Sequence, residues 1–317
     1  MFKQSKPLFF VCETPLHAGS GSDLGIVDLP IQRERHTSFP KIEGSSFKGA
    51  VREAVEKVDK EFSANGKTEK ISDKKKCIAL AFGPEEGDGH AGALGFSDAR
   101  LLLFPVKSVK GVFAWVTCPK VLEQFKRDMS LSGINVDIKS TEPSGDTCLT
   151  SSAALKVVGS NKIVLEEYAF TVSGSYDVKV NTKDLGTWLS ELMTDGFWKD
   201  KIKNDIVVLS NDDFKDFVNL STEVITRTKI NNDTGTVQPG ALFTEEFLPA
   251  ESVMYSLIMA SPVFMKEDKR KDAILQSDTD VMNYFEAALP EVIQIGGNAT
   301  LGKGIVRMYK SLLTQKN

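Results

Sequence analysis

The sequence contains few of the residues that build disulfide frameworks or metal centres, and no long apolar run. Its 317 residues include four cysteines and three histidines, and no two cysteines have the CxxC spacing of a zinc knuckle. The apolar run near the start, residues 8–12, is far shorter than the roughly 18 residues that cross a bilayer. It also lacks the cleavage pattern of a signal peptide. We therefore expect a reduced, cytoplasmic chain with no membrane partner and no multi-histidine metal site.

The composition is that of a globular protein, and its charge is unevenly distributed. Hydrophobic residues make up 41% and charged residues 26%, which is enough for a sizeable core. The formal net charge of −4 argues only weakly against nucleic acid, because binding depends on local clusters. Residues 31–52 are a basic segment with five positive and two negative side chains. The positive ones are Arg33, Arg35, Lys41, Lys48 and Arg52, and the negative ones are Glu34 and Glu43.

The first 128 residues predict the element order β-α-β-β-α-β. A strand over residues 8–14 precedes a helix capped by Ser45 or Ser46, and two strands over 93–104 and 111–117 join across Pro105. Pro119 then opens a helix to residue 128. The first helix is predicted from apolar residues that share one face: Phe47, Val51, Val55, Val58 and Phe62. The order indicates an α+β, ferredoxin-like fold rather than a doubly wound parallel sheet.

The later elements are predicted from shorter patterns. Residues 63–76 are expected to form a polar loop or insertion, before a short helix at 77–82 and an acidic, glycine-rich loop at 85–92. The rest of the chain predicts a strand, two helices, a strand, a helix and a last strand: 162–170, 183–193, 211–220, 252–261, 279–289 and 304–309.

The segment 17–35 combines glycines with two aspartates and two arginines. Gly19 and Ser20 would let a phosphate approach the backbone, Asp28 lies just beyond them, and Arg33 and Arg35 follow. An ordinary surface turn, in which Asp28 caps local amides, is the alternative interpretation.

The start of the first helix offers a second candidate site. Ser45 and Ser46 supply hydroxyls beside free N–H groups, and Lys48 and Arg52 are four residues apart on one helical face. The alternative is an ordinary capped helix with a solvated basic stripe.

Residues 297–304 superficially match the phosphate-loop pattern GxxxxGK(S/T). Gly304 replaces the Ser or Thr that would hold magnesium, so nucleotide hydrolysis is disfavoured. A glycine-rich turn that contacts a nucleic-acid backbone through Gly296, Gly297 and Lys303 is the better interpretation.

Residues 222–246 predict a β-hairpin. Apolar and β-branched residues alternate toward the turn signal at 231–235, and Arg227 and Lys229 lie on the leading arm. A surface hairpin without a function is the alternative.

Four segments share long motifs with one protein family. They read TPLHAGSGSDLGIVDLPIQRERHTSFPKIEGSSFKGAVREA, GALGFSDARLLLFPVKSVKGVFAWVTCP, TGTVQPGALFTEEFLP and GGNATLGKGIVRM. These segments resemble the RAMP superfamily and, within it, the repeating backbone subunits of Cmr-type (type III-B) CRISPR effector complexes. The resemblance extends from residue 8 to residue 309 and is weakest at 62–92 and 130–220, which we interpret as insertions.

The resemblance implies a fold and a function. The fold would be a single RAMP domain over residues 1–317, with a modified RRM-like core and a protruding hairpin, the thumb, at about 221–246. The function implied is binding of a CRISPR guide RNA in a filament of identical subunits, together with other subunits of the complex. The filament would cleave complementary target single-stranded RNA at regular six-nucleotide intervals in antiviral defence.

Roles for individual residues also follow from the resemblance. The family's catalytic aspartate falls on Asp28 and its motif histidine on His17, while Ser46, Lys48 and Arg52 would contact the guide RNA. The RNA supplies its own nucleophile, the 2′-OH, so one carboxylate can act as a base or help to hold a divalent ion, magnesium or manganese. A single carboxylate binds such an ion only weakly.

Two other functions remain open. One is a guide-RNA scaffold without catalysis, against which the intact Asp28 counts. The other is a RAMP endonuclease that processes precursor guide RNA, against which the long thumb counts.

Overall fold

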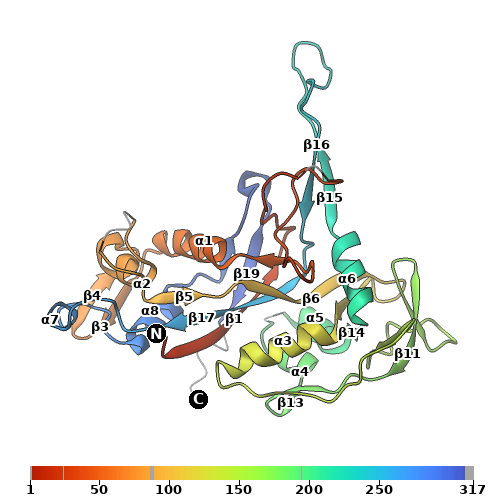
Figure 1. Cartoon of the computed structure of the whole chain (residues 1–317), viewed down its shortest axis with the longest axis horizontal. Helices are drawn as coiled ribbons and strands as arrows, with labels where there is room; N and C mark the ends of the chain where they lie inside the picture. The colour runs from red at the N-terminus through yellow and green to blue at the C-terminus, as the bar shows by residue number, and fades with distance from the viewer. Residues whose placement is uncertain (1, 24, 86–88, 194, 311–317) are drawn as a thin grey trace.

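The computed structural model describes residues 2–23, 25–85, 89–193 and 195–310. Its main feature is a mixed sheet of 12 strands, with helices on both faces (Figure 1). Along the sheet the order is β10 (Lys162–Leu165), β11 (Tyr168–Gly174), β9 (Thr147–Leu149), β14 (Ile206–Val208), β7 (Phe113–Thr117), β6 (Ala99–Lys107), β17 (Val253–Ala260), β1 (Gln4–Cys12), β19 (Ile305–Tyr309) and β18 (Val292–Gln294). Two short strands lie off this path: β2 (Lys41–Ile42) pairs with β6, and β5 (Leu94–Phe96) pairs with β17. The α+β expectation is confirmed.

The strands nearest the two ends of the described chain, β1 and β19, are neighbours close to one edge of the sheet. β1 pairs antiparallel with β17 on one side and with β19 on the other. Successive residues of β1 face opposite layers, because side chains alternate along a strand. Phe10 stacks on Phe47 of α1 (Gly44–Glu56), whereas Phe9 packs against Phe125 of α3 (Pro119–Ser130) and Trp188 of α4 (Leu185–Ser190).

Several predicted elements are confirmed. α3 begins at Pro119, α6 spans Asn211–Leu220 with Ser210 as its cap, and α8 (Asp278–Ala288) begins with a capping box. β17 and β19 match the last two predicted strands. The short helix near Cys77 is present as a π-helical turn (Lys74–Ile78) that continues into α2 (Ala79–Phe82).

Two predictions around α1 are wrong. The cap of α1 is Glu43 rather than Ser45 or Ser46, and the helix ends at Glu56, so Phe62 belongs to a strand. Residues 63–76 are not a loop, because β3 (Glu61–Ala64) and β4 (Lys67–Lys70) form a hairpin. Its turn is Asn65-Gly66, with both φ angles positive, which is the turn chemistry that favours two-residue hairpins.

The predicted break at Pro105 is also wrong. β6 runs through Pro105, which pairs with Trp115 of β7, and the interruption lies between β5 and β6. On its other edge β6 pairs with β17 only as far as Leu103. Proline is tolerated here because no strand requires its missing N–H.

The segment 130–220 contributes to the main sheet. Its strands β9, β10, β11 and β14 extend the sheet beyond β7, and β8 (Val136–Ile138), β12 (Val178–Val180) and β13 (Lys183–Asp184) form a small separate sheet. The predicted strand 162–170 is two strands, because residue 166 turns the chain at positive φ. The predicted helix 183–193 is the shorter α4, and α5 (Gly196–Asn204) was not predicted.

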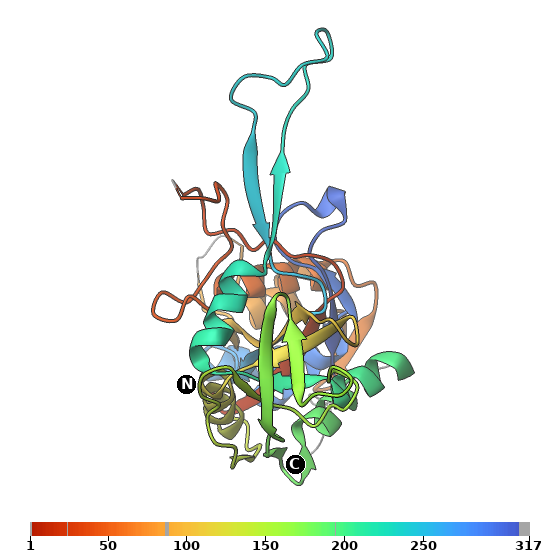
Figure 2. The same cartoon turned by 90° about the vertical axis from the view of Figure 1, so that its right-hand side faces the viewer.

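The thumb is present as a hairpin that projects from the body (Figures 1 and 2). β15 (Glu223–Arg227) pairs antiparallel with β16 (Phe243–Phe247), and an isolated bridge joins Ile230 to Val237 farther out. The remaining described helix is the short α7 (Glu267–Arg270). All four cysteines are buried and free, and none of the described helices is long and apolar enough to cross a membrane.

Candidate nucleic-acid interface at the base of the thumb

The glycine-rich loop, residues 17–33, folds back on itself beside the thumb. Gly19 and Ile31 form an isolated antiparallel bridge, Ser20 N donates to the Pro30 carbonyl (3.0 Å), and Gln32 N donates to the Ala18 carbonyl (2.8 Å). The turn at the end of the loop carries Asp28. The described residues of this loop therefore have a defined backbone, although the sequence shows no periodicity.

Asp28 lies at the surface and is held by a thumb residue. Thr244 of β16 donates to Asp28 Oδ2 through both its amide (2.7 Å) and its hydroxyl (2.8 Å). These bonds lower the pKa of Asp28, the amide bond contributing most. The carboxylate is therefore exposed and ionised at neutral pH, which are the properties that a proton acceptor requires.

His17 lies where the loop, the thumb and the C-terminal glycine-rich turn meet. Its Nδ1 is 2.7 Å from the Glu246 carbonyl, and its ring packs against Phe247 with 5.6 Å between centroids. The carbonyl of His17 accepts a hydrogen bond from Gly297 N (2.9 Å). The structure thus brings together His17 and the 296–304 turn, as well as the thumb, from three distant parts of the sequence.

A buried carboxylate, Glu245, connects the same three parts. It is only 4% exposed. Its carboxylate accepts a hydrogen bond from Asn298 Nδ2 (2.5 Å), forms an ion pair with Arg227 Nε (2.8 Å) and lies 3.7 Å from His17 Nε2. Burying a carboxylate is costly unless it is paired, and here the partners come from loop, thumb and turn.

The neighbouring Glu246 points to the opposite side of β16 and anchors the loop. It is 5% exposed. It accepts hydrogen bonds from Arg33 Nη2 (2.5 Å), Thr222 Oγ1 (2.8 Å) and the Ile31 amide (3.0 Å). Sequence reasoning missed Thr244, Glu245, Glu246 and Asn298. The sequence signal for this site is the pair of adjacent acids, Glu245 and Glu246, at the otherwise apolar end of a strand.

The basic segment 31–52 is less free than its charge implies. Arg33 pairs with Glu246, Lys41 with Glu43 and Asp98, and Arg52 with Glu56. Arg35 is exposed, and no described residue pairs with it. The excess charge is therefore mostly balanced, by distant partners at Glu246 and Asp98 and by the sequence neighbours Glu43 and Glu56.

Two further predicted contacts, Lys48 and Arg52, lie on α1 as expected but point into the chain. Lys48 Nζ donates to the Leu94 carbonyl (3.3 Å), and burial, followed by the charge of Arg52, lowers its pKa. Arg52 donates to Glu56 (2.8 Å) and to the Gly83 carbonyl (3.0 Å). Their contact with RNA stays a prediction, and it requires at least Arg52 to exchange partners.

The start of α1 is exposed at Ser45 and Ser46, but its first amide is already used. Gly44 N donates to Asp98 Oδ1 (2.9 Å). Gln32 bridges the glycine-rich loop to this helix start, since its side chain accepts from Glu43 N (2.7 Å) and donates to the Gly19 carbonyl (3.1 Å). Hence the loop and the helix start form one continuous surface.

The C-terminal turn presents one cation toward the thumb. Lys303 Nζ lies 4.9 Å from the centroid of Phe247, an arrangement that a cation–π interaction stabilises. Lys229, farther out on the thumb, is exposed and pairs with no described residue. Arg35 and Lys229 therefore remain available to a polyanion, whereas Lys303 already interacts with Phe247 and with the charge of Glu223.

No resident metal centre is formed by the described part of the chain, where no three His, Cys, Asp or Glu residues are grouped to hold an ion. Asp28 is a single carboxylate with one oxygen already engaged by Thr244. Such a donor set does not fit a protein-bound divalent ion, which requires about six oxygen ligands.

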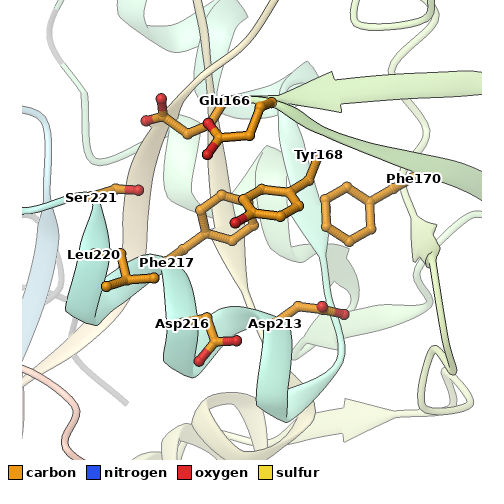
Figure 3. Close-up of a pocket in the computed structure, with 9 residues that line it drawn as sticks. Glu166, Tyr168, Phe170, Asp213, Asp216, Phe217, Leu220 and Ser221 are labelled. Carbon is orange, nitrogen blue, oxygen red and sulfur yellow. The ribbon is translucent and has the colours of Figure 1, made fainter.

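A separate pocket of about 210 Å³ lies between α6 and the β10–β11 turn. Figure 3 shows the rings of Tyr168, Phe170 and Phe217 at its centre, with Glu166 on one side and Asp213 and Asp216 on the other. An acidic rim repels phosphates, so this pocket is no part of an RNA-binding surface.

Comparison with known proteins is consistent with the geometry. The chain matches the RAMP superfamily over residues 9–307. It is 39% identical over 306 residues to the CRISPR system Cmr endoribonuclease Cmr4 of Pyrococcus furiosus, covering 93% of this chain and 92% of the relative. The crystal structure of oligomeric Cmr4 from that organism superposes with a TM-score of 0.67 at 31% identity, covering 96% and 98% of the two chains. A type III-B Cmr-beta complex bound to cognate target RNA contains a chain of the same fold, with a TM-score of 0.69, 20% identity and 97% coverage of both chains.

Proposed function

This chain belongs to the RAMP superfamily, and from that membership we propose that it is the repeating, guide-RNA-binding subunit of a type III-B CRISPR effector complex. In that complex it cleaves complementary target RNA at regular six-nucleotide intervals, as part of antiviral defence in the cytoplasm. Its partners are the guide RNA, the target RNA, further copies of itself and other subunits of the complex. The similarity to a Cmr endoribonuclease supports the activity, and the similarity to an oligomeric Cmr4 supports the self-assembly.

The observation that carries the proposal is the position of Asp28. Its carboxylate is exposed and ionised, and it is fixed at the foot of a hairpin that projects from the body (Figure 2). A hairpin of this kind can separate adjacent nucleotides of a duplex. A carboxylate at its foot then lies beside the nucleotide that has been displaced.

The chemistry needs little from the protein beyond alignment and one proton acceptor. Cleavage proceeds when the 2′-OH of the displaced nucleotide lies in line with the neighbouring phosphorus, and enforced alignment alone is worth several kcal/mol of the barrier. Asp28 accepts the proton of the 2′-OH as its oxygen attacks. His17 is hydrogen-bonded through Nδ1 to the Glu246 carbonyl, and its Nε2 lies 3.7 Å from Glu245, so we assign it to support of the thumb base, where it can also orient the phosphate.

A divalent ion, magnesium or manganese, would reach this surface with the RNA. Asp28 is the one predicted catalytic carboxylate that it could touch, and its remaining ligands would be water and RNA oxygens. Such an ion would neutralise charge on the reacting phosphate.

The test is cleavage by the complete complex assembled with guide RNA. The wild-type complex should cut complementary RNA into a ladder with a six-nucleotide period. Asp28→Ala should abolish the ladder and spare assembly and target binding, and Asp28→Asn should be nearly as inactive because the amide has lost the charge. Asp23→Ala, in the same loop, is the control for a general effect of losing an acid there. Wild-type cleavage by the Asp28→Ala complex would overturn the mechanism and leave a scaffold without catalysis.

A further inference from the structure

The thumb and the glycine-rich loop are joined by backbone pairing as well as by side chains. Leu29 forms an isolated parallel bridge with Glu245 of β16. Its amide donates to the Thr244 carbonyl (3.0 Å), and its carbonyl accepts from the Glu246 amide (3.0 Å). Leu29, the residue that follows Asp28, is therefore paired through its backbone with the thumb strand β16, although it lies more than 200 positions away in the sequence.

Thr244 holds Asp28 through three hydrogen bonds. Besides its two bonds to Oδ2, its hydroxyl oxygen accepts a hydrogen bond from the Asp28 amide (2.9 Å). The hydroxyl can therefore bind the backbone and the carboxylate of Asp28 at once, which restricts both side-chain torsions. Both Thr244 donors bind Oδ2, so Oδ1 is the oxygen left for a substrate.

The arrangement also explains why this carboxylate is rigid in spite of its exposure. A surface aspartate ordinarily samples several rotamers, because little is gained by fixing it. The two Thr244 donors on Oδ2, together with the hydrogen bond made by the Asp28 amide, leave the carboxylate a single orientation. The thumb strand supplies every one of these contacts, so a displacement of β16 displaces Asp28 with it.

We propose that Thr244 is the positioning residue for Asp28 and couples the thumb to the catalytic carboxylate, so that wedging of the duplex and placement of the proton acceptor are one event. The proposal rests on the proposed function. It gives the regular cleavage interval a physical origin, because each thumb carries its own carboxylate at a fixed offset. Thr244 acts through Asp28 and does not itself touch the reacting atoms.

The experiment compares Thr244→Val with Thr244→Ser in the complete complex. Valine keeps the shape and the backbone N–H and removes the hydroxyl, whereas serine keeps the hydroxyl. Under single-turnover conditions, Thr244→Val should cleave bound target about 10- to 100-fold more slowly, the scale expected for a misplaced catalytic group. Its affinity for target RNA should be unchanged. Thr244→Ser should restore the rate to within about threefold of wild type, which a loss of β-strand packing would not allow.

A second readout is independent of activity. The Asp28 amide should lose protection from hydrogen exchange in Thr244→Val and keep it in Thr244→Ser, because only the valine removes its acceptor. Thr226→Val is the matched control for this measurement, since Thr226 is directly opposite Thr244 in the hairpin register. It should leave the exchange of the Asp28 amide unchanged.

The outcomes separate this proposal from the one on which it rests. If Asp28→Ala is inactive and Thr244→Val cleaves at the wild-type rate, the positioning role is wrong and the proposed function stands. Equal slowing by valine and serine, or failure of Thr244→Val to assemble, would also overturn it, because both point to a role in folding. If Asp28→Ala itself cleaves normally, the assignment of the catalytic residue has failed.

Discussion

Arg33 and Glu246 lie 213 positions apart in the sequence and form an ion pair of 2.5 Å beneath the thumb. The same guanidinium donates to the Ser38 carbonyl (2.8 Å) and to the Val218 carbonyl at the end of α6 (3.0 Å). The planar fork of arginine suits such multiple contacts. One side chain thus joins the glycine-rich loop, α6 and β16, so a charged network fixes the foot of the thumb.

This network predicts a large effect on stability at Arg33. Arg33→Ala should lower the free energy of unfolding by about 3 kcal/mol, because it leaves Glu246 buried without its cation. Urea unfolding of the isolated subunit measures this change. Arg33→Ala combined with Glu246→Gln should recover part of the loss. A change of less than about 0.5 kcal/mol in the single variant would show that the pair is not structural.

Arg35 provides the opposite case two residues away. It is exposed and unpaired among the described residues, so Arg35→Ala should leave the unfolding free energy unchanged within about 0.5 kcal/mol. If it contacts guide-RNA phosphate, the slope of log affinity against log salt should fall by about 0.7. An unchanged slope in a binding titration over several salt concentrations would exclude Arg35 from the RNA contact.

Two glycines of the C-terminal turn should respond differently to alanine. Gly296 and Gly302 both have positive φ, but a Cβ on Gly296 would overlap the His17 carbonyl, whereas a Cβ on Gly302 would point into open space. Gly302→Ala should cost about 1 kcal/mol of unfolding free energy, from backbone strain alone. Gly296→Ala should cost clearly more, because it also pushes His17 away. Equal losses in thermal or urea unfolding would contradict this account of the turn.

The length of the thumb is expected to matter for cleavage and not for folding. Residues 231–236 are exposed, and their hydrogen bonds are made within the tip. Replacing them with a two-residue turn should leave the melting temperature unchanged, since hairpin tips tolerate change. The shortened subunit should assemble on guide RNA and lose the regular ladder. An unchanged ladder would mean that alignment of the target arises elsewhere.

Glu251 predicts a pH dependence of stability. Burial, and then the charge of Glu13, raise the pKa of Glu251 to about 7. Between the unfolded value near 4.5 and this folded value, the native state binds more protons than the unfolded state. Stability therefore falls as the pH rises through that window.

The variant that removes this titration is Glu251→Gln. It should match the wild type in unfolding free energy at pH 4 and exceed it by about 1 kcal/mol at pH 8, a figure reduced because the group is partly exposed. Urea unfolding at the two pH values measures the difference. The same offset at both values would show that ionisation of Glu251 is not its cause.

Much of the fold follows from local pattern. The strands around residues 8–12, 253–260 and 305–309 are apolar enough to be recognised alone, and α3, α6 and α8 carry a proline or a serine cap at their starts. The polar composition of residues 61–70 is typical of a loop, and this is why the sequence analysis does not predict the hairpin there. The Asn65-Gly66 turn is nevertheless a strong local signal for it. In the sequence, Pro105 indicates the end of a strand. β6 continues through it because β17 does not pair with β6 beyond Leu103, and the sequence does not show where that pairing stops.

The family resemblance, the position of Asp28 in its motif and the existence of the thumb can all be recognised in the sequence, because motifs and turn signals are local. Which charges are free depends on the fold. Arg33 and Lys41 resemble Arg35 in the sequence, yet the fold brings Glu246 to Arg33 and Asp98 to Lys41. The fold also determines what holds Asp28. Thr244 and the two buried glutamates lie in a family segment that assigns them no role. Their roles arise because hydrogen bonds and ion pairs depend on separations of about 3 Å that chain distance does not encode.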